Sequence, residues 1–370
     1  MSFIVVMLLL TSLLITRIPT FHHVRFQKPY SIETRKVSVI IPARNEEHNI
    51  KKLLSTLNDN RSNLYEIIVV DDGSTDQTAH IAAEMGATVL KPKKLPKGWL
   101  GKSWACWNGA KKANGSILLF LDADTWVEKG GIKRIHDVFE LKKGFLSIHP
   151  YHGVKKPYES LSAFFHYIVF ASVGGFHLFN QNGTASGGFG QCLVCEKSEY
   201  FRYGGHQAIC GEVVENMAFA NYVREQQGEV YCMGGRGAVS MRMYPNGISE
   251  LIRGWSKSFV SGAGKTEPIY LFLVSLWLTG MIHYVVSLPL LIQQYPILAG
   301  TSYVLMGIML FSKLRHIGAF SYVTSFLFPI HLFFFLIVFA CSLLQTTVVR
   351  KVTWKGRKIQ VDHAKKRFFK

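Results

Sequence analysis

Acidic side chains are scarce in this sequence: 24 Asp and Glu stand against 42 Lys and Arg, which gives a formal net charge of +18. No basic helix with interleaved aromatic residues and no familiar nucleic-acid-binding motif accompanies this charge, so a nucleic-acid partner is not expected. A basic surface beside apolar segments instead favours contact with anionic lipid headgroups. An anionic substrate would draw on the same excess of positive charge.

Cysteine is also sparse, with six in 370 residues. Nothing in their spacing suggests a disulfide framework, and we therefore expect a reducing compartment. Cys192 and Cys195, followed by His206 and Cys210, have a spacing that resembles zinc ligands. The two residues between the first pair are apolar and predict a strand, which turns the two thiols to opposite faces. The sequence therefore argues against a zinc site.

Charge is absent from the first sixteen residues, which are apolar apart from Ser and Thr. A bilayer span needs about 20 apolar residues, and this run reaches that length only if Arg17 extends its charged end to the interface. No charged region precedes the run and no small-residue cleavage site follows it, which disfavours a cleaved signal peptide. We expect an uncleaved N-terminal membrane anchor over residues 1–21.

Charge is nearly absent from residues 269–345 as well, and we expect membrane helices there. Residues 269–293 are long enough to span a bilayer, 296–311 are marginal, and 318–345 are long. An earlier apolar and aromatic stretch at residues 161–179 is either a buried helix or an interfacial one.

The placement of positive charge conflicts with three full spans. Lys313, Arg315 and a basic tail over residues 346–370 all belong on the cytoplasmic side by the positive-inside rule. Three spans after a catalytic domain in the cytoplasm would put that tail outside. Either residues 296–311 are re-entrant or one helix is only half inserted. We expect a multi-pass protein of the cell membrane with its active site facing the cytoplasm.

Residues 37–151 alternate strand and helix signals, which predicts a mainly parallel sheet flanked by helices, and we expect an α/β catalytic domain over residues 30–245. Ligands of such sheets bind outside the carboxyl ends of the strands. The predicted strands are 37–42, 66–71, 88–91, 117–121 and 145–149. The predicted helices are 46–57, 76–85, 103–113 and 132–139.

Aspartates follow two of these strands. Asp71 and Asp72 end one strand, and Asp122 and Asp124 come directly after another. Hard oxygen ligands at a strand end suit Mg²⁺ or Mn²⁺, and such ions usually share their ligands with substrate phosphates. For Asp71 we expect only a capped turn before the next helix.

Three motifs in the order of this chain, at residues 37–47, 70–76 and 122–124, make it resemble glycosyltransferase family 2, inverting enzymes with a GT-A fold. The resemblance implies a UDP-sugar donor. The implied donor-binding residues are Ala43, Arg44, Glu46, Asp72, Lys102 and Asp122. It implies that Asp124 binds the divalent ion that bridges the diphosphate. With the apolar segments described above, we expect a GT-A nucleotide-sugar domain between N-terminal and C-terminal transmembrane helices.

The same resemblance places the catalytic base at Glu215, where the family usually has a second acid in place of Asn216. Arg253 and Trp255 resemble an element that lines the acceptor side, although Gly254 separates them here. The segment 246–268 is then an interfacial acceptor-side segment. Trp255 is alternatively an interfacial membrane anchor. His206 and Lys257 complete the implied acceptor side, and His206 is alternatively a core residue.

Within the family, the chain resembles the members that transfer glucose from UDP-glucose to a C30 carotenoid acid in the membrane. The residues that carry this are 96–102, 150–152, 189–190, 204–206, 254–257, 262–264 and 354–357. Alternatives are a hydroxyl lipid acceptor such as a hopanoid, sphingolipid or glycerolipid, a polysaccharide synthase, and a non-catalytic membrane protein that binds nucleotide sugars.

Overall fold

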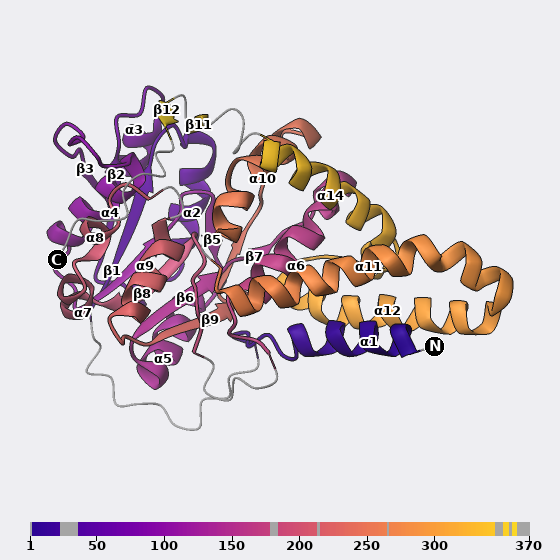
Figure 1. Cartoon of the computed structure of the whole chain (residues 1–370). Helices are drawn as coiled ribbons and strands as arrows, with labels where there is room; N and C mark the ends of the chain where they lie inside the picture. Colours follow the sequence, from indigo (N-terminus) through magenta and orange to yellow (C-terminus); the bar gives the residue numbers. More distant parts are fainter. Residues whose placement is uncertain are drawn as a thin grey trace.

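The computed structural model describes residues 2–22, 36–177, 184–212, 215–264, 266–344, 351–354 and 357–360. An α/β part contains the central sheet, and a helical part extends from one side of it (Figure 1). The side chain of Lys257 and most of the predicted tail, 346–370, lie outside the described residues. The predicted domain boundaries stay predictions.

Strand β1 lies inside the central sheet and pairs in parallel with β2 on one side and with β4 on the other. The described strand order is β3-β2-β1-β4-β8-β6-β9, and β8 alone runs opposite to its neighbours. The sheet is therefore mixed, with the predicted parallel character in most pairs. The strands are β1 (Val37–Ala43), β2 (Glu66–Asp71), β3 (Thr88–Leu90), β4 (Ile117–Leu121), β6 (Phe145–His149), β8 (Cys192–Glu196) and β9 (Val230–Gly234).

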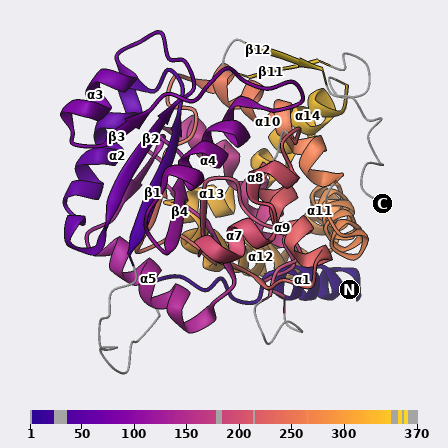
Figure 2. The ribbon, with the colours of Figure 1, turned by 90° about the vertical axis from the view of Figure 1, so that its left-hand side faces the viewer.

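Helices cover both faces of this sheet (Figure 2). One face packs on α2 (Glu47–Asn58), α3 (Thr78–Glu84) and α5 (Gly131–Lys142). The other packs on α4 (Gly101–Lys112), α7 (Lys197–Arg202), α8 (Gly205–Ala208) and α9 (Glu215–Glu225). Strand β8 is buried between the layers and places Cys192 in one core and Cys195 in the other. The prediction that these thiols face opposite ways is confirmed.

Short elements join the two parts of the molecule. A small second sheet has the order β5-β10-β7, with β5 (Thr125–Val127), β7 (Tyr151–His152) and β10 (Val239–Met241). The remaining short elements are η1 (Arg61–Asn63), η2 (Pro157–Ser162), and the hairpin strands β11 (Lys351–Trp354) and β12 (Arg357–Gln360).

The helical part packs around one large apolar core. Its helices are α1 (Ser2–Leu14), α6 (Ala163–Ser172), α10 (Ile248–Ala263), α11 (Pro268–Gln294), α12 (Pro296–Ile317), α13 (Tyr322–Phe326) and α14 (Phe328–Leu344). Helix α6 lies in the stretch predicted as buried or interfacial, and nearly all of its side chains are buried. The buried alternative is therefore confirmed.

Within the described ranges, two helices, α11 and α12, are long and apolar enough to cross a membrane. They form an antiparallel hairpin that leaves the α/β part and returns to it (Figure 1). Residues 296–311 lie in a full 22-residue helix, so the re-entrant alternative finds no support. Helix α14 is also apolar, but with 17 residues it is shorter than these two helices.

Helix α1 has only 13 residues, fewer than a span needs. It lies along α11 and α12, and a buried hydrogen bond fixes it there. Trp277 donates from Nε1 to Oγ1 of Thr11 at 2.9 Å, and Thr11 donates in turn to the Met7 carbonyl at 2.9 Å. At the other end, Lys313 Nζ donates to the Thr16 carbonyl at 2.7 Å.

We predict that Thr11→Val destabilises the protein by about 1–3 kcal/mol, because the buried indole N–H of Trp277 loses its acceptor. The measurement is the midpoint of thermal unfolding of the full chain in detergent. Thr279→Val is the matched control, because Thr279 is exposed on α11 and bonds only to the Ser275 carbonyl one turn earlier. Equal midpoints for the two variants would contradict this role of Thr11.

Candidate functional site

The carboxyl ends of β2, β1 and β4 lie side by side, because β1 pairs in parallel with both neighbours. This brings the two predicted aspartate pairs to one edge of the sheet. Asp72 is buried there and donates its backbone N–H to the Ala43 carbonyl at 2.9 Å. Asp71 instead accepts from the backbone N–H of Ser74 at 2.9 Å. The prediction that Asp71 caps a turn is confirmed.

Arg44 connects the ends of β1 and β2. Its Nη1 donates to the Asp72 carbonyl at 2.7 Å and lies 3.9 Å from Oδ2 of the same residue. Glu46 donates its backbone N–H to Oγ1 of Thr78 at 2.8 Å, and its Oε2 accepts from Nδ2 of Asn49 at 2.8 Å. Ala43, Arg44, Glu46 and Asp72 thus form one side of the candidate site.

Lys102 forms the centre of the site. It is the second residue of α4, and its Nζ lies 2.8 Å from Oδ1 of Asp122 and 2.6 Å from Oε1 of Glu215. The same nitrogen lies 2.9 Å from Oδ2 of Asp122 and 3.1 Å from the Gly190 carbonyl. Asp122, just after β4, and Glu215, at the start of α9, therefore contact one ammonium group.

Electrostatics keep this ammonium charged. Burial lowers the pKa of Lys102, but the charges of Asp122 and Glu215 outweigh burial, and the pKa of Lys102 is raised overall. The pKa of Asp122 is raised to about 7, because burial and the carboxylates of Asp124 and Glu215 together outweigh the lowering by Lys102. Three carboxylates are thus close enough to influence one another, with Lys102 between two of them.

The aspartates after β4 fit a divalent ion only in part. Among the residues that the structure describes, no three His, Cys, Asp or Glu side chains converge to hold a metal ion. Two hard carboxylates, Asp122 and Asp124, suit an ion that takes its other ligands from a diphosphate and from water. The residues therefore fit Mg²⁺ or Mn²⁺ that binds together with a phosphate-bearing ligand.

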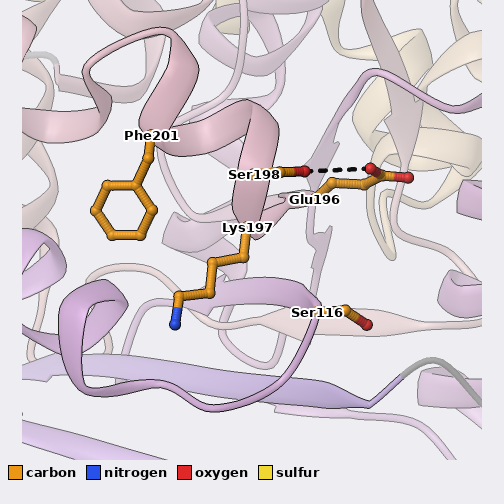
Figure 3. A pocket seen from close by; sticks show the side chains of 5 residues that line it. All are labelled: Ser116, Glu196, Lys197, Ser198 and Phe201. Carbon is orange, nitrogen blue, oxygen red and sulfur yellow. Dashed lines mark hydrogen bonds between the residues drawn. The ribbon is translucent and has the colours of Figure 1, made fainter.

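A separate open depression lies at the other end of β4, away from this site (Figure 3). Ser116 stands before the strand, whereas Asp122 follows it. Glu196 pairs with Ile117 at that same far end. The depression is lined by Ser116, Glu196, Lys197, Ser198 and Phe201. It holds none of the predicted site residues.

Comparison with known proteins decides the family. Residues 38–190 match the family model of glycosyl transferase family 2. The chain is also 34% identical, over 354 residues, to a 4,4'-diaponeurosporenoate glycosyltransferase of Staphylococcus haemolyticus, covering 89% of each chain. The chain belongs to glycosyltransferase family 2. The 4,4'-diaponeurosporenoate glycosyltransferase of Staphylococcus aureus strain MRSA252 is 32% identical over 342 residues, 90% of this chain and 91% of that one.

Solved structures give a weaker likeness. A mannosyltransferase from Pyrobaculum calidifontis, in complex with GDP-Man and Mn²⁺, matches with a TM-score of 0.49 and 16% identity. The match covers 85% of this chain and 91% of that one. Family membership, rather than this likeness, supports the GT-A fold of this glycosyltransferase.

Of the residues predicted for the acceptor side, Arg253, Trp255 and Lys257 lie on α10, and His206 lies on α8. His206 is buried, its Nδ1 lies 2.8 Å from the Tyr200 hydroxyl, and its ring stacks on Phe219. These contacts are those of a core residue. Arg253 is exposed on α10, and the side chain of Lys257 lies outside the described residues. The acceptor-side roles of these three residues stay predictions.

Trp255 is buried inside the helical part. Its ring stacks on Phe165 at 4.8 Å and meets His166 edge to face at 5.1 Å. The alternative that Trp255 anchors the protein at the membrane surface is therefore wrong. The reason is α6, which comes from a distant part of the chain and covers the indole ring.

Tyr244 is a residue of this region that the sequence analysis missed. Burial, followed by the charges of Asp124 and Glu250, raises the pKa of Tyr244. The Tyr244 ring rests against the Gly254 backbone and 6.1 Å from the Trp255 ring. The sequence held one signal of this contact. Gly254 separates Arg253 from Trp255, unlike in the family element, and a glycine at that position allows an aromatic ring to approach α10 closely.

We predict that Gly254→Ala destabilises the protein by about 1–3 kcal/mol, because a Cβ at this position overlaps the Tyr244 ring. Thermal unfolding in detergent measures the effect. Gly262→Ala, on the same helix with open space around the new Cβ, is the control and should unfold at the wild-type temperature or above it. Two variants with the same midpoint would show that Tyr244 is not held by Gly254.

Proposed function

We propose that this protein is a membrane-bound, inverting glycosyltransferase that transfers glucose from UDP-glucose to the carboxylate of 4,4'-diaponeurosporenoate, giving a glucosyl ester. The observation that carries the proposal is the contact of Lys102 with both Asp122 and Glu215. This contact joins the donor side of the site to the expected position of the nucleophile. The names of the relatives at 32–34% identity supply the acceptor.

The donor half of the proposal uses the sheet edge. Asp72, positioned by Arg44, would contact the uridine, with Ala43 and Glu46 beside it. Asp124 would bind the divalent ion. When bound, this ion stabilises the negative charge that develops on the departing diphosphate.

The acceptor half explains why Glu215 is paired. A carotenoid acid, with a reference pKa of about 4, is already ionised at pH 7. One of its carboxylate oxygens can attack the anomeric carbon as the bond to UDP breaks, and no proton has to leave. An unpaired Glu215 would repel this anion, but its Oε1 lies 2.6 Å from Lys102 Nζ, which offsets the charge. A hydroxyl acceptor would instead need a free base.

The helical part suits an acceptor that reaches the site from a bilayer. Large apolar side chains of the α11–α12 hairpin are exposed, with Val286 at 73% and Ile297 at 82%. Such surfaces are unfavourable in water and normal in lipid. Lys313 and Arg315 stand where α12 returns to the α/β part, which fits a cytoplasmic active site. With α1 held in the bundle, the protein would keep its N-terminal segment as an uncleaved anchor.

Asp124→Ala should lower glucose transfer at least about 100-fold, because a bound divalent ion supplies several kcal/mol of charge stabilisation. EDTA should abolish the wild-type activity, and Mn²⁺ or Mg²⁺ should restore it. The assay measures UDP release and the glucosyl ester in detergent with UDP-glucose and the carotenoid acid. Asp137→Ala, on the outer helix α5, is the control. If Asp124→Ala were fully active in the presence of EDTA, the proposal that a divalent ion takes part in the reaction would be wrong.

Glu215→Gln should separate the two acceptor classes. With the carotenoid acid we expect a loss of less than about 10-fold, because no proton is removed and the amide still bonds to Lys102. With a hydroxyl lipid acceptor the loss should reach about 10²–10⁴-fold. The measurement is kcat for each acceptor at saturating UDP-glucose. A near-complete loss with the carotenoid acid would show that Glu215 does more than orient the acceptor.

A further inference from the structure

The Lys102 ammonium occupies a cage of oxygen atoms. Two come from Asp122, one from Glu215 and one from the Gly190 carbonyl, at 2.6–3.1 Å. An ammonium has three protons to donate, so these four oxygens exhaust its hydrogen-bonding capacity. The Lys102 ammonium is therefore surrounded by oxygen atoms much as a bound metal ion would be. It contacts both carboxylate oxygens of Asp122, which we expect to lie beside the diphosphate of the donor.

This arrangement has a consequence for a divalent ion. Both carboxylate oxygens of Asp122 are already engaged by Lys102, and the described residues offer no group of three ligands around Asp124. An ion that approached Asp122 would have to compete with Lys102 and would meet its positive charge at close range. A lysine is suited to yield under such competition, because its charge sits on a flexible four-carbon stem.

We propose that Lys102 is the resident counter-ion of the donor site. It neutralises Asp122 and Glu215 while no donor is bound, and it keeps the affinity for a divalent ion low until a nucleoside diphosphate supplies further oxygen ligands. This inference rests on the proposed function only in taking a nucleoside diphosphate as the ligand. It differs from a lysine that simply contacts phosphate, which would leave the affinity for the metal alone unchanged.

The test is a titration of the full chain in detergent with Mn²⁺, in which electron paramagnetic resonance reports free Mn²⁺. Without nucleotide, the wild-type protein should bind Mn²⁺ weakly, and Lys102→Met should bind it at least about 10-fold more tightly, because a neighbouring positive charge is gone. Addition of UDP should tighten the binding of Mn²⁺ by the wild-type protein and reduce the difference in Mn²⁺ affinity between the wild-type protein and Lys102→Met. Lys112→Met is the control, because it removes the same charge from the exposed far end of α4 and should match the wild-type protein.

Lys102→Arg provides a second variant in case the methionine variant does not fold, and it should keep the weak Mn²⁺ binding because it keeps the charge. Two results would overturn the inference: equal Mn²⁺ affinity of the wild-type protein and Lys102→Met without nucleotide, or tight binding of Mn²⁺ by the wild-type protein without nucleotide. The titration without nucleotide tests the counter-ion role of Lys102 whether or not the donor substrate is a UDP-sugar. If UDP leaves Mn²⁺ binding by the wild-type protein unchanged while Lys102→Met binds Mn²⁺ more tightly, the counter-ion role stands and the UDP-sugar proposal fails.

Discussion

Parallel pairing of β1 with both β2 and β4 is the constraint from which the site follows. It places the ends of three strands at one edge, and it thereby gathers Asp72, Asp122 and Asp124 from motifs far apart in the sequence. Carboxylates that approach one another in a half-buried site repel, so the edge is stable only with cations nearby. Arg44 supplies one on the β1–β2 side, and Lys102 supplies the other at the end of β4.

Lys102 also connects parts of the molecule that do not share a sheet. Through its ammonium, the start of α4, the end of β4, the loop at Gly190 and the start of α9 meet at one point. Tyr244, whose ring rests against the Gly254 backbone, packs on α10, and α10 packs in turn on α14.

The strands of the sheet could be predicted from the sequence because they are short apolar runs with sharp ends, and β2, β4 and β6 have the predicted bounds. The aspartates at the strand ends were predictable for the same reason. The partners of Lys102 could not be predicted, because Glu215 reaches Lys102 only through the packing of α9 on the same face of the sheet as α4. The burial of Trp255 could not be predicted either, because its contact with Phe165 depends on how α6 enters the bundle, and no local pattern contains that information.

The bond between Thr11 and Trp277 has a consequence for how this protein is made. The ribosome releases α1 first, yet the partner that fixes it belongs to α11, which follows the entire α/β part. Until α11 is made, the Thr11 hydroxyl can bond only within its own helix, to the Met7 carbonyl, and the contact that fixes α1 against α11 is missing. The helical bundle can therefore be completed only late, when α11 in the last third of the chain packs against α1. By then the strands that carry the aspartates have been synthesised and can already have paired.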